Sequence, residues 1–212
     1  MATPPELVQA ISEATGVALA TVVDMDRRLV KAKLRTKGGR GLNAARMTAL
    51  DAARLLTAVL ASPQSNAAAE AVLRYEHTRP DKDRSNSGLF GNIGLDDLAE
   101  LGPGHGFVEG LAALITSAAG GSLAGLMTGT KGVKAPHLEV FAFTRETHGR
   151  IRISGLRNGV TANVEYVPAA QKGKAGKPRN AKGENSGDLE QSRRITEQTV
   201  RTIARLLAGE TP

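Results

Sequence analysis

The residue types that could carry out catalysis are few and scattered in this chain of 212 residues. The four histidines stand at positions 77, 105, 137 and 148, and there is no cysteine. No serine occupies a nucleophile elbow, and no His-x-x-x-His pair has the spacing of two metal ligands. His105, inside a glycine-rich turn, is the best single candidate for acid–base chemistry, but a histidine without a partner is usually structural. We therefore predict no catalytic, cofactor or metal site, and we expect that the protein is not an enzyme.

The same turn, Gly102-Pro-Gly-His-Gly106, could also suggest a loop that cradles phosphate at the start of a helix. It lacks the Lys-Ser/Thr pair of a Walker loop and the Gly-x-Gly-x-x-Gly spacing of dinucleotide-binding folds. It also follows a predicted helix rather than a strand. We predict an ordinary connection here, and an enzymatic function resting on this turn is the weakest hypothesis.

Anion binding is the chemistry that the composition does favour. The chain has 28 Lys and Arg against 21 Asp and Glu, a net charge of +7. Residues 27–46 hold eight basic residues and no acidic one, and residues 172–182 hold five more with no acidic residue. Aromatic residues make up only 3%, so stacking of bases on exposed rings is not expected. The charge therefore predicts contacts to the phosphates of nucleic acid.

The elements that must position these cations are predicted in residues 1–62. Thr3 and Glu6 have the spacing of a capping box, and Gly16 can end the helix that they begin. A second helix is predicted from about Ala18 to Lys33. The glycine-rich stretch 34–41 is typical of a tight hairpin whose backbone approaches phosphate closely. Thr48 caps a third helix that Ser62-Pro63 ends.

This order of elements resembles the winged helix-turn-helix of MerR-type regulators and phage excisionase-like proteins. The residues that carry the resemblance are Ala14-Thr15-Gly16-Val17, Arg27-Arg28-Leu29 and Lys37-Gly38-Gly39-Arg40, so it covers roughly the first quarter of the chain. It implies that the second helix enters the major groove and that the wing meets the DNA backbone or a minor groove. The predicted contacts to double-stranded DNA are Thr21, Arg27, Arg28, Lys31, Arg35, Lys37, Arg40 and Arg46.

The middle segment, residues 63–168, is predicted to be α+β. Helical spacing predicts helices at 67–78, 95–101 and 107–118. Alternation of apolar and polar residues then predicts a small antiparallel sheet, with strands at 138–145, 150–154 and 160–167. Residues 110–130 carry no charge, but their many glycines and alanines make a buried helix and loop a better interpretation than a membrane span, and no membrane partner is expected.

The C-terminal part is predicted to contain a basic linker and one helix. Residues 169–187 are rich in Lys, Gly and Asn and should be disordered. Residues 188–208 should form an amphipathic helix that docks on its own sheet or pairs with another subunit. The predicted fold class is α+β, with four parts: a winged helix-turn-helix (1–62), a support or oligomerisation domain (63–168), the linker (169–187) and the C-terminal helix (188–212).

The leading functional hypothesis is a sequence-specific DNA-binding protein, a transcriptional regulator of phage or mobile-element type. The alternative is an assembly or adaptor protein that oligomerises through its middle and C-terminal helices and binds DNA incidentally. Residues 1–5 carry no basic stretch followed by an apolar run, so we expect no signal peptide and a cytoplasmic location.

Overall fold

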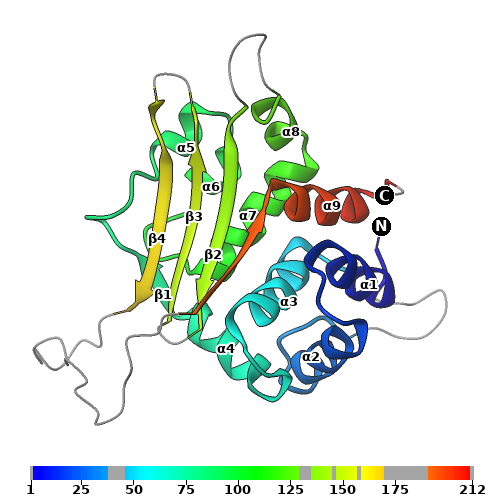
Figure 1. The fold of residues 1–212 in the computed structure, drawn as a ribbon. Helices are drawn as coiled ribbons and strands as arrows, with labels where there is room; N and C mark the ends of the chain where they lie inside the picture. The colour runs from blue at the N-terminus through cyan, green and yellow to red at the C-terminus, as the bar shows by residue number, and fades with distance from the viewer. Residues whose placement is uncertain are drawn as a thin grey trace, which may run out of the picture.

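The protein combines helices with one antiparallel sheet, so the predicted α+β class is correct. The computed structural model describes residues 2–37, 46–128, 135–144, 147–156, 159–169 and 191–210. The sheet has five strands in the order β1-β4-β3-β2-β5. Among the described residues, no helix lies on the face turned toward the viewer in Figure 1, which we call the uncovered face, and α5, α6 and α7 lie against the other face. The predicted linker lies mostly outside the described residues.

The three N-terminal helices begin and end close to the predicted residues. α1 spans Pro4–Thr15, α2 spans Leu19–Lys31 and α3 spans Ala49–Ala61. Gly16 ends α1 in the left-handed conformation, with φ of 71°. Thr48 caps α3 by accepting a hydrogen bond from the Asp51 N–H at 3.1 Å.

Helix α3 lies in the centre of the molecule and is almost entirely buried. It packs against α2, α4 and α7 and against strands β2 and β5. One apolar core therefore runs from α1 through α3 to the sheet. The core is continuous across residues 62 and 168, and the domain boundaries placed there remain predictions.

The three strands predicted from the alternating pattern are present. They are β2 (His137–Phe143), β3 (His148–Ser154) and β4 (Ala162–Pro168). Each pairs antiparallel with the next, and Leu138, Val140, Ile151 and Ile153 point into the core. A fourth strand, β1 (Thr78–Pro80), pairs with β4 directly after α4 (Ala68–Glu76), where the sequence predicted the end of a helix at about Thr78 and then a loop.

The predicted helix 188–208 is wrong in its first part. Ser192–Thr196 forms strand β5, which pairs antiparallel with β2, and only Glu197–Ala208 forms a helix, α9. The pairing places Ile195 beside Val140 in the core and covers what would otherwise be an exposed edge of β2. This tertiary contact outweighs the local helical pattern, since propensity is only a weak preference.

Helix α9 docks within its own chain, on helices rather than on the face of the sheet. Val200, Ile203 and Ala204 are buried, and α9 packs against α1 and α7. The Thr199 hydroxyl also donates a hydrogen bond to the Ala14 carbonyl at 3.3 Å. The first and last helices of the described chain, α1 and α9, consequently lie side by side (Figure 1).

Helices α5 (Leu89–Asn92), α6 (Asp96–Ala99) and α7 (Phe107–Ala119) lie on one face of the sheet (Figure 1). The 3₁₀ turn Ser65–Ala67 packs against α2 and α4, and α8 (Ser122–Leu126) packs against α7 and α9. Helix α7 packs against α3, α4, α9 and strand β3. Gly110 of α7 has no side chain, and the Tyr166 ring of β4 fills the space beside it. Within the described ranges, every helix is too short or too polar to cross a membrane.

Replacing Gly110 by alanine should lower the free energy of unfolding by about 1–3 kcal/mol, because the new methyl group would overlap the Tyr166 hydroxyl. The matched control is Gly125→Ala in α8, where no atom lies within 4 Å of the added carbon. That control should be neutral or stabilising by about 0.5–1 kcal/mol. Urea unfolding measures both, and a Gly110→Ala protein as stable as the control would contradict the packing described here.

Candidate nucleic-acid interface

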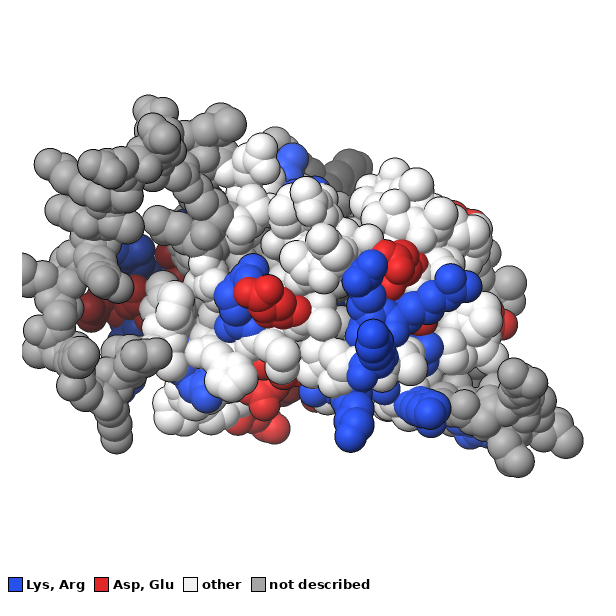
Figure 2. Space-filling model, turned by 90° about the horizontal axis from the view of Figure 1, so that it is seen from below, with Lys and Arg blue, Asp and Glu red and all other residues white. Residues whose placement is uncertain are grey.

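The second helix of the N-terminal pair lies on the outside of the molecule. Residues 16–18 join α1 to α2, and Val22, Met25 and Leu29 of α2 face the core. Figure 2, which views the molecule from below, shows Lys and Arg side chains gathered on the right, where α2 lies. Five residues on and after α2 are exposed and form no ion pair within the described chain; we call them the basic surface: Arg27, Lys31, Lys33, Lys37 and Arg46.

The charge of Asp24, the first acidic residue of α2, is balanced by Arg28 on the same helix. Its Oδ2 accepts hydrogen bonds from the Ser65 hydroxyl at 2.5 Å and from Arg28 Nε at 2.9 Å. The Ser65 hydrogen bond and the Arg28 guanidinium hold the pKa of Asp24 below its usual value. Asp24 stays ionised, and Arg28 provides its counter-charge.

The second acidic residue, Asp26, points inward and pairs with Arg35. Arg35 Nε lies 2.5 Å from Asp26 Oδ1, and Arg35 Nη2 lies 2.9 Å from Oδ2. The two side chains are only 9% and 11% exposed. Burial raises the pKa of Asp26, and the Arg35 charge opposes that rise. Asp26 is therefore directed away from any ligand at the surface.

This pairing leaves Arg35, one of the predicted DNA contacts, in a covered ion pair. The sequence placed Arg35 at the start of the wing, among the eight basic residues of the acid-free run 27–46. Its guanidinium instead binds Asp26 and donates a further hydrogen bond to the Thr36 carbonyl at 3.0 Å. Exposing it would leave the carboxylate of Asp26 buried without a partner, which is costly.

A single carboxylate, that of Asp51, binds Thr36 and Thr48, the residues on either side of 37–47 in the connection from α2 to α3. Its Oδ1 accepts from the Thr36 N–H at 2.8 Å, and its Oδ2 accepts from the Thr36 hydroxyl at 3.1 Å. Oδ2 also accepts from the N–H and hydroxyl of Thr48, at 3.0 and 2.7 Å. Burial disfavours the ionised form, but the hydrogen bonds from Thr36 and Thr48 outweigh it and lower the pKa of Asp51.

Helix α2 ends in a strained turn that displays a lysine. The Leu34 N–H donates to the Leu29 carbonyl at 2.9 Å, and the Lys33 N–H donates to the Val30 carbonyl at 3.1 Å. These two bonds define a Schellman motif, whose left-handed position is normally glycine. Lys33 occupies it with φ of 61° and is the one described non-glycine residue with a positive φ. Such a position costs a side chain about 1–2 kcal/mol, and strain of this size is common at functional sites.

The structure brings together only part of the predicted contact set. Thr21 and Arg28 are half-buried and Arg35 is in a covered ion pair, while the other four described members are exposed. Arg40 and the predicted hairpin tip lie outside the described residues, and the flanking residues 34–37 and 46–48 are not in strands. Two further exposed residues lie outside the predicted contact set: Lys33, which stands in the acid-free run, and Leu19, which is 43% exposed at the start of α2.

His105, the best catalytic candidate from the sequence, is a core residue. Its Nδ1 lies 2.7 Å from the Gly102 carbonyl, so this nitrogen carries the proton. Its Nε2 then accepts a hydrogen bond from the Tyr166 hydroxyl at 2.9 Å. Both ring nitrogens are satisfied, and burial raises the pKa of Tyr166 far above its usual value. The turn at 102–106 thus fixes the start of α7 against the sheet.

Comparisons with known proteins give no relative: scans of protein-family models, of curated proteins and of solved structures each return no match.

Replacing Asp51 by asparagine should lower the free energy of unfolding at pH 7 by about 1–3 kcal/mol, because the amide nitrogen cannot accept the hydrogen bonds of Thr36 and Thr48. The folded-state pKa of Asp51 is depressed, so its contribution is complete above the unfolded pKa of about 3.9 and is lost as the pH falls through the folded pKa. The difference between wild type and variant should therefore shrink in acid.

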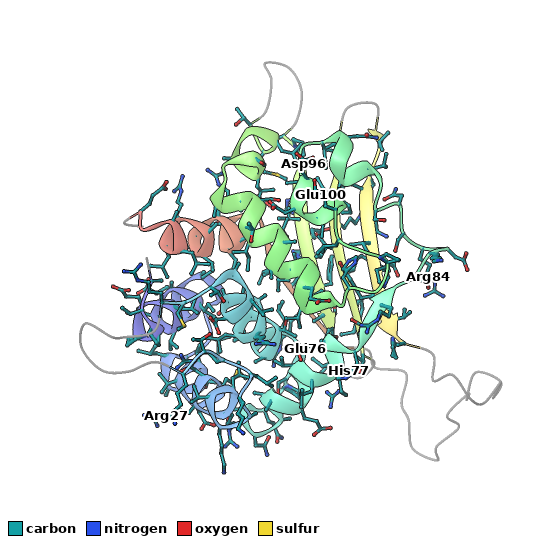
Figure 3. The ribbon with its side chains drawn as sticks, turned by 180° about the vertical axis from the view of Figure 1, so that it is seen from behind. Arg27, Glu76, His77, Arg84, Asp96 and Glu100 are labelled. Carbon is teal, nitrogen blue, oxygen red and sulfur yellow. The ribbon has the colours of Figure 1, made fainter. Side chains whose placement is uncertain are left out.

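Urea unfolding at pH 7 and below pH 4 makes the measurement, with the exposed Glu100→Gln as control (Figure 3). The control should be as stable as wild type. The hydrogen bonds to Asp51 would be contradicted if Asp51→Asn were as stable as wild type at pH 7. They would also be contradicted if the difference in unfolding free energy between the two proteins grew in acid.

Replacing Lys33 by glycine should raise the free energy of unfolding by about 1 kcal/mol, because glycine adopts a positive φ without strain. Arg27→Gly, at an exposed position inside α2, is the control and should lose about 1 kcal/mol. Thermal melts followed by circular dichroism compare the two. No gain for Lys33→Gly would show that the left-handed turn carries no strain.

Proposed function

We propose that this chain binds double-stranded DNA sequence-specifically, as a transcriptional regulator of phage or mobile-element type. In this proposal α1 and α2 form a helix-turn-helix with α2 as the recognition helix. The glycine-rich stretch 34–41, with Lys37 and Arg40, acts as its wing.

One observation carries the proposal: α2 faces outward with cations that have no counter-charge in the described chain, while its own carboxylates are neutralised. Asp24 and Asp26 would repel phosphate if both were free. Arg28 and Arg35 instead pair with them. The five residues of the basic surface remain for phosphate.

In the proposed complex, the two ends of α2 contact different parts of the DNA. Arg27 and Lys31 are one turn apart, about 6 Å along the axis, and suit contacts to the DNA backbone near the helix C-terminus. Thr21 and the exposed Leu19 lie in the first turn, the part of a recognition helix that contacts base edges. The Leu19 side chain would suit the methyl group of thymine.

The Asp51 hydrogen bonds support a role for the wing. Thr36 and Thr48 are bound to the same carboxylate, so Lys37 and Arg46 leave the core close to one another. Two cations at a fixed loop base lose less entropy on binding phosphate than cations on a free loop would.

The adaptor alternative is less well supported. It requires α7 and α9 to offer apolar faces to partners. Those faces are already covered within the chain, since α9 packs against α1 and α7 and its buried residues face them.

Replacing both Arg27 and Lys31 by alanine should weaken DNA binding and lower the slope of log K against log salt by about 0.9 for each phosphate that the variant no longer neutralises. A control of equal charge is Arg74→Ala with Arg205→Ala, two exposed arginines on α4 and α9. The control should keep wild-type affinity and slope.

Fluorescence anisotropy at several salt concentrations, with a duplex selected from genomic fragments and with a scrambled duplex, makes the comparison. Specific recognition requires tighter binding of the selected duplex by wild type. If the double variants lose affinity equally, binding reflects net charge alone and the assignment of α2 fails.

A further inference from the structure

The uncovered face of the sheet contains a second, separate cluster of arginines. A cavity of about 400 Å³ opens on this face beside β3 and β4. Its walls include Arg84, Ser85 and Asn86 from the segment after β1, Arg150 and Arg152 from β3, and Asn163 from β4. In Figure 3, Arg84 lies on the side of the molecule opposite Arg27, so this cavity is distinct from the basic surface.

The wall formed by residues 84–86 is fastened to β4 by hydrogen bonds. Asn86 N–H donates to the Asn163 carbonyl at 2.9 Å, and the Asn163 N–H donates to Asn86 Oδ1 at 2.6 Å. Asn163 Nδ2 donates to the Arg84 carbonyl at 2.8 Å, and the Glu165 N–H donates to the Ser85 hydroxyl at 3.0 Å. The cavity is therefore preformed, which lowers the entropic cost of binding.

The two carboxylates nearest to Arg152, those of Glu165 and Glu139, are paired with other cations. Glu165 is bound by Arg150 at 2.9 Å and by His148 Nε2 at 3.1 Å. Glu139, the residue of β2 opposite Arg152 in the sheet, is bound by Arg194 at 2.7 Å.

Arg152 itself is half-buried and makes no hydrogen bond or ion pair with any described residue. On the rim, Arg84 lies 3.6 Å from Asp81 with its side chain 65% exposed, so it can turn toward a ligand. The exposed Asp83 is the one remaining carboxylate of the wall. A half-buried cation in a preformed polar cavity is suited to an anion that supplies the missing acceptors.

We propose that this cavity binds the phosphate group of a small phosphorylated sugar, with Arg152 and Arg84 as the anion ligands. Guanidinium groups on two walls suit the three terminal oxygens of a phosphate monoester better than the two of a carboxylate. Asp83 and Asn86 can accept hydrogen bonds from sugar hydroxyls. The same chemistry occurs in a free sugar phosphate and at the 5′-phosphate end of a nucleic acid strand.

Ribose 5-phosphate tests the site, with ribose as the matched compound that lacks the phosphate. Isothermal titration should show saturable binding of ribose 5-phosphate and none of ribose. Arg152→Ala should weaken binding about tenfold or more. Arg84→Ala alters only an exposed side chain and should also weaken binding of ribose 5-phosphate. This variant replaces Arg152→Ala in the test if Arg152→Ala does not fold. Arg27→Ala, on α2, should bind ribose 5-phosphate like wild type.

A single-stranded oligonucleotide with and without a 5′-phosphate identifies the source of the phosphate. Preference for the phosphorylated strand over ribose 5-phosphate assigns the site to strand ends, and the reverse preference assigns it to a free metabolite. Equal binding of ribose and ribose 5-phosphate, or unchanged binding in both arginine variants, overturns the proposal. The test is independent of duplex binding by α2, which Arg152→Ala should leave unchanged.

Discussion

The carboxylate of Asp51 is the constraint on which the arrangement of the N-terminal cations depends. It accepts hydrogen bonds from Thr36 and Thr48, the residues on either side of 37–47, and it belongs to the first turn of α3. Because α3 is the central helix of the core, this one side chain connects the segment to the buried centre of the molecule. The burial of Asp51 is offset by these hydrogen bonds, which keep it ionised.

Charge pairing explains how α2 can carry two aspartates and still offer a cationic surface. Asp24 is neutralised by Arg28 at the surface, and Asp26 is neutralised by Arg35 beneath it. A buried pair such as Asp26–Arg35 adds little net stability, since desolvation offsets most of its attraction. Its consequence is geometric, because it fixes the chain after α2 and leaves the outer cations without competing acids.

The sequence predicted those elements whose signals are local. Gly16, Thr48 and Ser62 mark helix ends through backbone chemistry, and the strands β2 to β4 follow from alternation. Strand β5 could not be predicted this way, because its conformation depends on pairing with β2 far away in the chain. Likewise Arg35 looked free because its partner, Asp26, stands nine residues earlier and across the turn that ends α2. The arginine cavity had no local signal, since residues 81–86 resemble an ordinary loop until β4 orders them.

The central claim is that α2 is the surface on which a duplex lies. Hydrogen exchange of the backbone amides, compared with and without a selected duplex, tests this claim residue by residue. The account predicts slower exchange in α2 and at residues 46–48 when DNA is bound, with no change on the open face of the sheet. Slower exchange confined to the sheet, or no change anywhere in α2 at saturating DNA, would contradict it.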